Sequence, residues 1–96
     1  MQSVLVKFEV RKSAIEKALL LIRGFVSLVK ENEPETIIYH SFQAEDNPCE
    51  FVLVMTFASD EAEERHQTSE YSQDFADELF EICIDEPEFQ LFNLIV

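Results

Sequence analysis

The chain has 96 residues, of which 47% are hydrophobic and 28% are charged, a composition typical of one folded domain spanning residues 1–96. Twenty Asp and Glu residues against seven Lys and Arg residues give a net charge of −13. This excess of negative charge argues against nucleic acid as a partner, because binding to phosphates needs cations, and against an anionic membrane surface. The longest apolar stretch contains Arg23 and is too short to cross a bilayer, and the N-terminus has no signal-peptide pattern. We therefore expect a soluble cytoplasmic protein.

Hydrophobic periodicity and turn residues predict six elements in the order β-α-β-β-α-β. These are a strand at about 3–10, a helix from Ser13 to just before Pro34, strands at 36–43 and 51–57, a helix from Ser59 to about Cys83, and a strand at 89–96. A break in the second helix near Thr68 and Ser69 is left open. This order predicts an α+β ferredoxin-like fold, in which a four-stranded antiparallel sheet carries two helices on one face.

Local signals refine the two helices. Ser13 and Glu16 have the spacing of a capping box, in which both side chains bond free backbone amides at a helix start. Ser59 precedes a run of acidic residues, which favours an N-cap there. Gly24 is the only glycine and falls on the predicted buried stripe of the first helix, which indicates a close approach by another element.

The predicted strands are apolar on both faces. In the strand at 51–57, for example, Val52 and Val54 point away from the side chains of Phe51, Leu53, Met55 and Phe57. Two helices cover only one face of a sheet, so the other face would form a large exposed apolar patch on a monomer. We therefore expect a homodimer in which two sheets pack face to face.

The sequence contains few signals for metal or cofactor binding. His40, Cys49, His66 and Cys83 have no metal-ligand spacing, and one glycine is too few for a phosphate-binding loop. We expect no metal and no cofactor. The two cysteines form no CxxC motif and are expected to be free thiols, although a disulfide between them stays open.

The predicted interior contains a small number of polar residues. If the second helix is continuous, its inward stripe consists of Ala62, His66, Ser69, Ala76, Leu79, Phe80 and Cys83. His66 is the candidate catalytic base, because imidazole titrates near neutral pH. The alternative is a structural histidine bonded to a backbone carbonyl or to Glu70, one turn further on. Tyr39, Tyr71 and Asn93 are candidates for contact with a bound molecule, and the alternative for the tyrosines is a core or rim position with satisfied hydroxyls.

Several short motifs together resemble the antibiotic biosynthesis monooxygenase (ABM) family. Glu33-Pro34, five residues before Tyr39, resembles the family's E-P-G-x-x-x-Y segment. The positions of Phe57, Ser59, Glu61, Ala62, His66, Ser69, Tyr71, Phe75 and Leu79 are similar to its aromatic-x-S-x-E-A-x-x-x-H-x-x-S-x-H/Y-x-x-x-F-x-x-x-L pattern. The chain departs from the family at Glu35, where glycine is usual, and at Met55-x-Phe57, where E-x-W or E-x-Y is common.

The resemblance implies a dimeric α/β barrel of two ferredoxin-like protomers. It also implies, as in some members, oxidation of a quinol or polyphenol by molecular oxygen without a cofactor, with His66 as the obvious candidate for the base. The predicted substrate-binding residues are Tyr39, Tyr71, Phe57 and Asn93. Haem-degrading members carry an Asn and a His where this chain offers Lys7 and Ala76, so haem degradation is not expected. The alternative function is that of a non-catalytic dimer that binds a small apolar ligand or acts as an interaction module.

Overall fold

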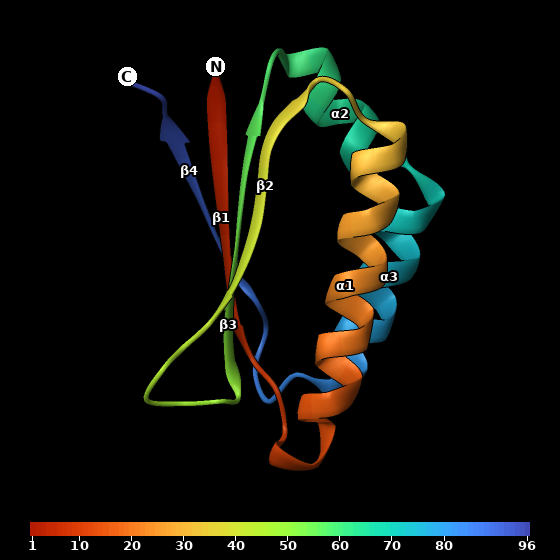
Figure 1. The fold of residues 1–96 in the computed structure, drawn as a ribbon, viewed down its shortest axis with the longest axis vertical. Coiled ribbons are helices and arrows are strands. Elements are labelled where there is room, and N and C mark those ends of the chain that lie inside the picture. Colours follow the sequence, from red (N-terminus) through yellow and green to blue (C-terminus); the bar gives the residue numbers. More distant parts are fainter.

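The computed structural model describes all 96 residues. In chain order the elements are β1 (Gln2–Glu9), the short 3₁₀ helix η1 (Lys12–Ala14), α1 (Ile15–Asn32), β2 (Thr36–Gln43), β3 (Glu50–Phe57), α2 (Asp60–Thr68), α3 (Glu70–Ile82) and β4 (Glu88–Asn93). The strands form one antiparallel sheet, and all helices lie on the same side of it (Figure 1). This arrangement confirms the predicted α+β ferredoxin-like fold.

The sheet has the strand order β2-β3-β1-β4, so β1 and β3 are its central strands. They pair along their whole length, from Gln2 opposite Phe57 to Glu9 opposite Glu50. Alternate side chains of these strands point toward the helices and are buried, namely Val4, Val6, Phe8, Phe51, Leu53, Met55 and Phe57. The register thus places one apolar face of the sheet under the helices.

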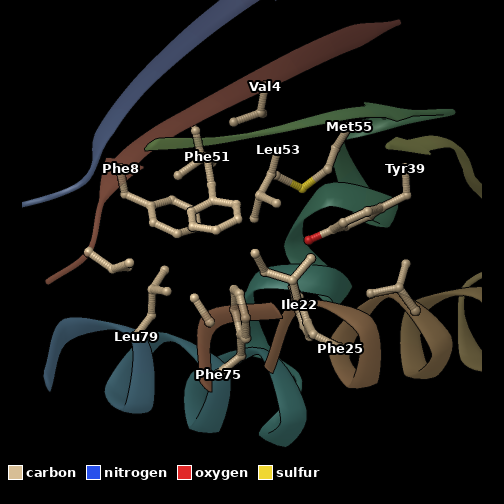
Figure 2. Packing of buried hydrophobic residues seen from close by; sticks show 14 of the residues in the cluster. Val4, Phe8, Ile22, Phe25, Tyr39, Phe51, Leu53, Met55, Phe75 and Leu79 are labelled. Carbon is tan, nitrogen blue, oxygen red and sulfur yellow. The ribbon is translucent and has the colours of Figure 1, made fainter. Parts of the chain in front are cut away.

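The core lies between that face and the helices (Figure 2). Helix α1 contributes a narrow apolar stripe formed by Ala18, Ile22, Phe25 and Val29. The rings of Phe25 and Phe75 stack with centroids 4.1 Å apart, which joins α1 to α3. On the other side of the core, Phe8 of β1 stacks on Phe51 of β3 at 5.6 Å.

The start of α1 differs from the prediction of a capping box. Ser13 lies inside the turn of η1, and α1 begins at Ile15 after Ala14, with no side-chain cap. An N-cap residue needs an extended backbone, and here Arg11 has that conformation (φ −60°, ψ 145°) instead of Ser13. The predicted cap at Ser59 is confirmed, since its hydroxyl accepts the amide of Ala62 at 3.1 Å.

The second predicted helix is interrupted at Ser69, so three helices cover the sheet. Ser69 is extended (φ −65°, ψ 146°); its hydroxyl donates to the His66 carbonyl at 2.8 Å and accepts the Ser72 amide at 3.3 Å. The break rotates the inward face of α3 relative to a continuous helix. Phe80 is therefore 53% exposed, whereas Ile82 is only 2% exposed. The predicted stripe holds at the buried Leu79 and at the half-buried Ala76 and Cys83, and it is wrong at Phe80 and in leaving out Ile82.

Gly24 is exposed on α1, and a Cβ atom added there would meet no atom within 4 Å. The prediction of a close approach at this glycine is therefore wrong. The reason is that α1 buries only a narrow stripe. It faces the sheet through Ile22 and Phe25, and Gly24 lies on the solvent side.

The face of the sheet away from the helices is uncovered. Its apolar side chains include the exposed Ile38, Phe42 and Phe92 and the half-buried Leu5, Val52 and Val54. Both cysteines are free. None of the helices combines the length and the apolarity that crossing a membrane requires.

Candidate active site

An apolar cavity of about 200 Å³ lies between the sheet and the helices. Hydrophobic side chains make up most of its lining, and the polar side chains that reach it are His66, Tyr39, Gln67 and Ser72. Phe80 of α3 and Phe89 of β4 also line it and are 53% and 67% exposed, which places the mouth of the cavity between these two elements. The cavity can accept a largely apolar molecule that carries a few polar atoms.

His66 lies on α2, and its side chain is only 9% exposed. Three aromatic rings surround the imidazole, with centroids at 5.2 Å for Phe57, 5.7 Å for Phe25 and 5.9 Å for Tyr39. The predicted site residues His66, Tyr39 and Phe57 thus come together, although they belong to α2, β2 and β3. All three line the cavity.

The hydrogen-bond partner of His66 is Glu33, the residue that follows α1. The Nδ1 atom of His66 lies 2.9 Å from one carboxylate oxygen of Glu33 and 3.0 Å from the other. The predicted structural partners, a backbone carbonyl or Glu70, are therefore wrong. The prediction considered partners close to His66 along the chain, whereas the observed contact joins residues 33 positions apart.

Glu33 is the functional candidate that the sequence reasoning missed. Its side chain is 9% exposed, and its carboxylate also accepts hydrogen bonds from the hydroxyls of Thr36, at 2.7 Å, and Tyr71. The signal in the sequence was the acidic residue before Pro34, which ends α1. The chain turns there, with the Glu33 amide still bonded to the Val29 carbonyl at 2.8 Å, and the carboxylate points inward.

The other ring nitrogen of His66, Nε2, has no hydrogen-bond partner in the chain and is not among the fully buried polar atoms. Since Nδ1 faces Glu33 and the residue lines the cavity, Nε2 is the nitrogen available to a bound molecule. An unpartnered imidazole nitrogen at a cavity can accept a hydrogen bond or a proton from a bound molecule.

Tyr39 carries the one buried side-chain oxygen without a partner, its phenolic hydroxyl. Figure 2 shows this hydroxyl directed into the layer between the sheet and the helices. Burial, with the nearby Glu33 charge, raises the pKa of Tyr39 far above its ordinary value, so the group stays protonated. It is therefore a hydrogen-bond donor that has no acceptor within the chain.

Tyr71 does not line the apolar cavity, where the prediction placed it. It donates to Glu33 from α3 and lines a separate polar depression of about 340 Å³, together with Glu33, Glu35 and Arg65. Burial and the hydrogen bond to Glu33 raise the pKa of Tyr71 to about 12. Its position one residue after the start of α3, which the break at Ser69 creates, turns it toward Glu33 rather than into the cavity.

Asn93 also lies outside the cavity. It is exposed at the end of β4, opposite Gln2. In the same strand Phe89 lines the cavity, and four residues of extended chain, about 13 Å, separate the two positions. No group of three or more His, Cys, Asp or Glu side chains is arranged to hold a metal ion.

The fold and the cavity together define a small ferredoxin-like protein with a histidine at the edge of an apolar binding site. The family model for antibiotic biosynthesis monooxygenases matches residues 1–78, so the chain belongs to the ABM family. This confirms the resemblance seen in the motifs. No protein with curated annotation matches the chain closely enough to count as a relative.

Solved structures of similar proteins support the fold. One is a crystal structure of an antibiotic biosynthesis monooxygenase, with a TM-score of 0.91 and 20% sequence identity over 100% of both chains. Another is Rv0793 from Mycobacterium tuberculosis, with a TM-score of 0.90 and 17% identity over 99% of this chain and 95% of that one. A conserved protein from Methanosarcina mazei Go1 has a TM-score of 0.87 and 18% identity over 95% and 89%. At these identities the likeness shows the shared fold.

Proposed function

We propose that the protein is a cofactor-independent monooxygenase that oxidises a quinol or polyphenol with molecular oxygen. The observation that carries this proposal is an unpartnered polar atom, Nε2 of His66, at an apolar cavity that Tyr39 also lines. The Tyr39 hydroxyl is a second unpartnered polar atom, buried in the cavity wall, and a bound molecule would reach it by a small movement of the ring. An aromatic ring with two oxygen substituents offers a proton to the first and an acceptor to the second. Membership in the ABM family supports the same reaction class.

The size and lining of the cavity suit an aromatic ring. An engineered apolar cavity of about 150 Å³ binds benzene, and the cavity here measures about 200 Å³, which leaves room for ring substituents. Phe57 and Phe25 stand beside His66 and offer faces and edges for aromatic packing.

The proposed chemistry begins with removal of a phenolic proton by Nε2 of His66. The phenolate is electron-rich and passes an electron to O₂, while Tyr39 donates a hydrogen bond to the other ring oxygen. One oxygen atom then replaces a ring hydrogen to form a new C–O bond, and the other leaves as water with two hydrogens of the substrate. A quinol and one molecule of O₂ thus give a hydroxyquinone and water, with no peroxide released.

We also propose that two copies pair through the uncovered face of the sheet. The apolar character of that face supports the pairing, because the six side chains named above would otherwise remain in water. The two free thiols support a location in the reducing cytoplasm.

A second candidate function is binding of a small apolar molecule without turnover. The observation that favours it is the lining at Met55 and Phe57, which are both apolar and supply no polar group beside His66. In that case the cavity would take up its ligand and O₂ would not be consumed.

The test is oxygen uptake by the purified protein with a panel of hydroquinones and polycyclic phenols, with peroxide measured in parallel. We expect uptake without peroxide, reduced on the order of 10²- to 10⁴-fold in His66→Gln, the usual contribution of a general base. Glu64→Gln is the control, because Glu64 is exposed on the same helix as His66 and does not line the cavity. Absence of uptake across the panel, with binding retained in native mass spectrometry, would favour the second candidate.

A further inference from the structure

We propose that Glu33 is the positioning residue for His66: it holds the imidazole proton on Nδ1, so that Nε2 faces the cavity without a proton and is ready to accept one. The inference rests on the proposed function and assigns it a second residue. It arises from the contact of His66 with both oxygens of the buried Glu33 side chain.

The hydrogen bonds around Glu33 determine where the imidazole proton lies. An ionised carboxylate only accepts hydrogen bonds, and Glu33 accepts them from the hydroxyls of Thr36 and Tyr71. Its two oxygens also lie 2.9 and 3.0 Å from Nδ1 of His66. The His66 nitrogen that faces this acceptor must therefore carry a hydrogen. In a neutral imidazole the other nitrogen is then unprotonated, and here that nitrogen is the one without a partner.

Two elements, β2 and α3, keep the carboxylate in place. Thr36 at the start of β2 donates to one oxygen of Glu33, and Tyr71 at the start of α3 donates to the other. The backbone of Glu33 is fixed as well, because its carbonyl accepts the Thr36 amide at 3.1 Å. A group held from several sides positions its partner more precisely than a flexible surface side chain does.

Among the charged side chains near the site, only His66 contacts the carboxylate of Glu33. Arg65, which lines the same polar depression as Glu33, pairs with Glu35, and the side chains of Arg65 and Glu35 are both more than half exposed. No lysine or arginine forms an ion pair with Glu33. When Nε2 takes a proton from the substrate, the carboxylate of Glu33 is therefore the counter-charge for the imidazolium that forms, as in other carboxylate–histidine pairs.

The decisive measurement is the tautomer of His66, read from the ¹⁵N chemical shifts of both ring nitrogens at a pH where the imidazoles are neutral. The chain has only two histidines, and the exposed His40 serves as an internal reference. We expect the proton of His66 on Nδ1 in the native protein. A proton on Nε2 would overturn the proposal, because Nδ1 would then be an acceptor.

Two isosteric variants sharpen the test. In Glu33→Gln the amide can donate to Nδ1, so we expect the Nδ1–H form of His66 to be lost and the Nε2–H form to appear. Glu35→Gln makes the same chemical change two residues away, on a carboxylate that does not contact His66, and should leave the tautomer unchanged. Retention of the Nδ1–H form in both Glu33→Gln and Glu33→Ala would also overturn the proposal, because the alanine variant leaves no side-chain acceptor at this position. The native spectrum decides the question even if Glu33→Gln does not fold.

Kinetics give an independent readout. Glu33→Gln should lower kcat at least about tenfold and change KM little, because the substrate touches His66 and Tyr39 rather than Glu33. Equal kcat values for the native protein and Glu33→Gln would contradict the positioning role. If the native protein consumes no oxygen, the proposed function fails, and the tautomer measurement still decides whether Glu33 sets the proton on His66.

Discussion

The rings of Tyr39 and His66 lie 5.9 Å apart at the edge of the cavity, and the Tyr39 hydroxyl has no partner although the residue is only 4% exposed. A buried hydroxyl without an acceptor destabilises a folded protein, by about 1–3 kcal/mol relative to a satisfied one. The proposed function would give this hydroxyl a partner in the bound molecule, whereas the hydroxyl of Tyr71 already has one in Glu33. This relationship distinguishes the two tyrosines of the protein.

Tyr39→Phe should leave the free energy of unfolding unchanged or raise it by up to about 1 kcal/mol, because it removes a polar atom that has no partner. The same variant should bind an oxygen-bearing aromatic ligand more weakly. Urea denaturation measures the first effect, and a titration with the best ligand of the panel measures the second. A clear loss of stability would show that the hydroxyl has an acceptor in the folded protein.

Tyr71→Phe is the matched substitution, and we expect it to lower the free energy of unfolding. It removes a donor to the Glu33 carboxylate, and hydrogen bonds to charged groups contribute about 1.5–3 kcal/mol. We expect a loss of about 1–2 kcal/mol in the same denaturation experiment, since Tyr71 is only half-buried and water can replace part of the bond. Equal stability of the two variants would argue against this assignment of the hydroxyls.

The two tyrosines should also resist ionisation. Burial raises the pKa of Tyr71 to about 12 and that of Tyr39 further, whereas tyrosine in an unfolded chain ionises near a pKa of about 10. Their contribution to stability is therefore fully present below about pH 10 and is lost as the pH rises toward the folded pKa values. The chain has two tyrosines and no tryptophan, so near-ultraviolet absorbance reports them cleanly. We expect almost no tyrosinate at pH 10.5 until the protein unfolds, and half-ionisation near pH 10 would contradict the burial.

Gly24→Ala should stabilise the protein by roughly 0.5–1 kcal/mol. Glycine in the middle of a helix is less favourable than alanine by about that amount, and the space around Gly24 is open. The midpoint of urea denaturation should rise with an unchanged slope. A decrease would indicate that another surface approaches this part of α1, for instance in an assembly.

Phe42→Lys tests the proposed pairing of two sheets. Phe42 is 55% exposed on the uncovered face of the sheet, and a buried lysine there would oppose association. Leu20→Lys is the control, because Leu20 is 70% exposed on α1, on the helical side. We expect sedimentation velocity to show dimers for the native protein and Leu20→Lys and monomers for Phe42→Lys. A native protein that sediments as a monomer would refute the pairing.

The parts of the fold that sequence predicts well are those with a local cause. Alternation of side chains located all four strands, and Ser59 located the start of α2, because each depends on residues close together in the chain. Ser13 misled for the same reason: its spacing to Glu16 is correct, yet the backbone forms a 3₁₀ turn there. The prediction for Gly24 depended on the width of the stripe that α1 buries, and that width is determined by packing against the sheet rather than by local sequence.

The candidate site was predictable only in part. The motifs placed His66, Tyr39 and Phe57 on elements that converge, and the cavity contains all three. The bond from His66 to Glu33 depends on how the end of α1 meets α2, and periodicity carries no information about such a distance. Tyr71 likewise turns toward Glu33 because the chain breaks at Ser69, an interruption that the sequence left open.

The polar depression beside Glu33 has a consequence for how protons travel. Glu33 and Tyr71 line this depression, and His66 lines the apolar cavity. The His66–Glu33 contact therefore connects the polar depression to the apolar cavity. In the proposed reaction, the aromatic molecule enters past Phe80 and Phe89, and the proton that it gives up leaves by way of His66 and Glu33 toward the polar depression. Substrate and proton would then follow separate paths. The proton would reach the solvent through side chains, without water entering the apolar cavity where O₂ reacts.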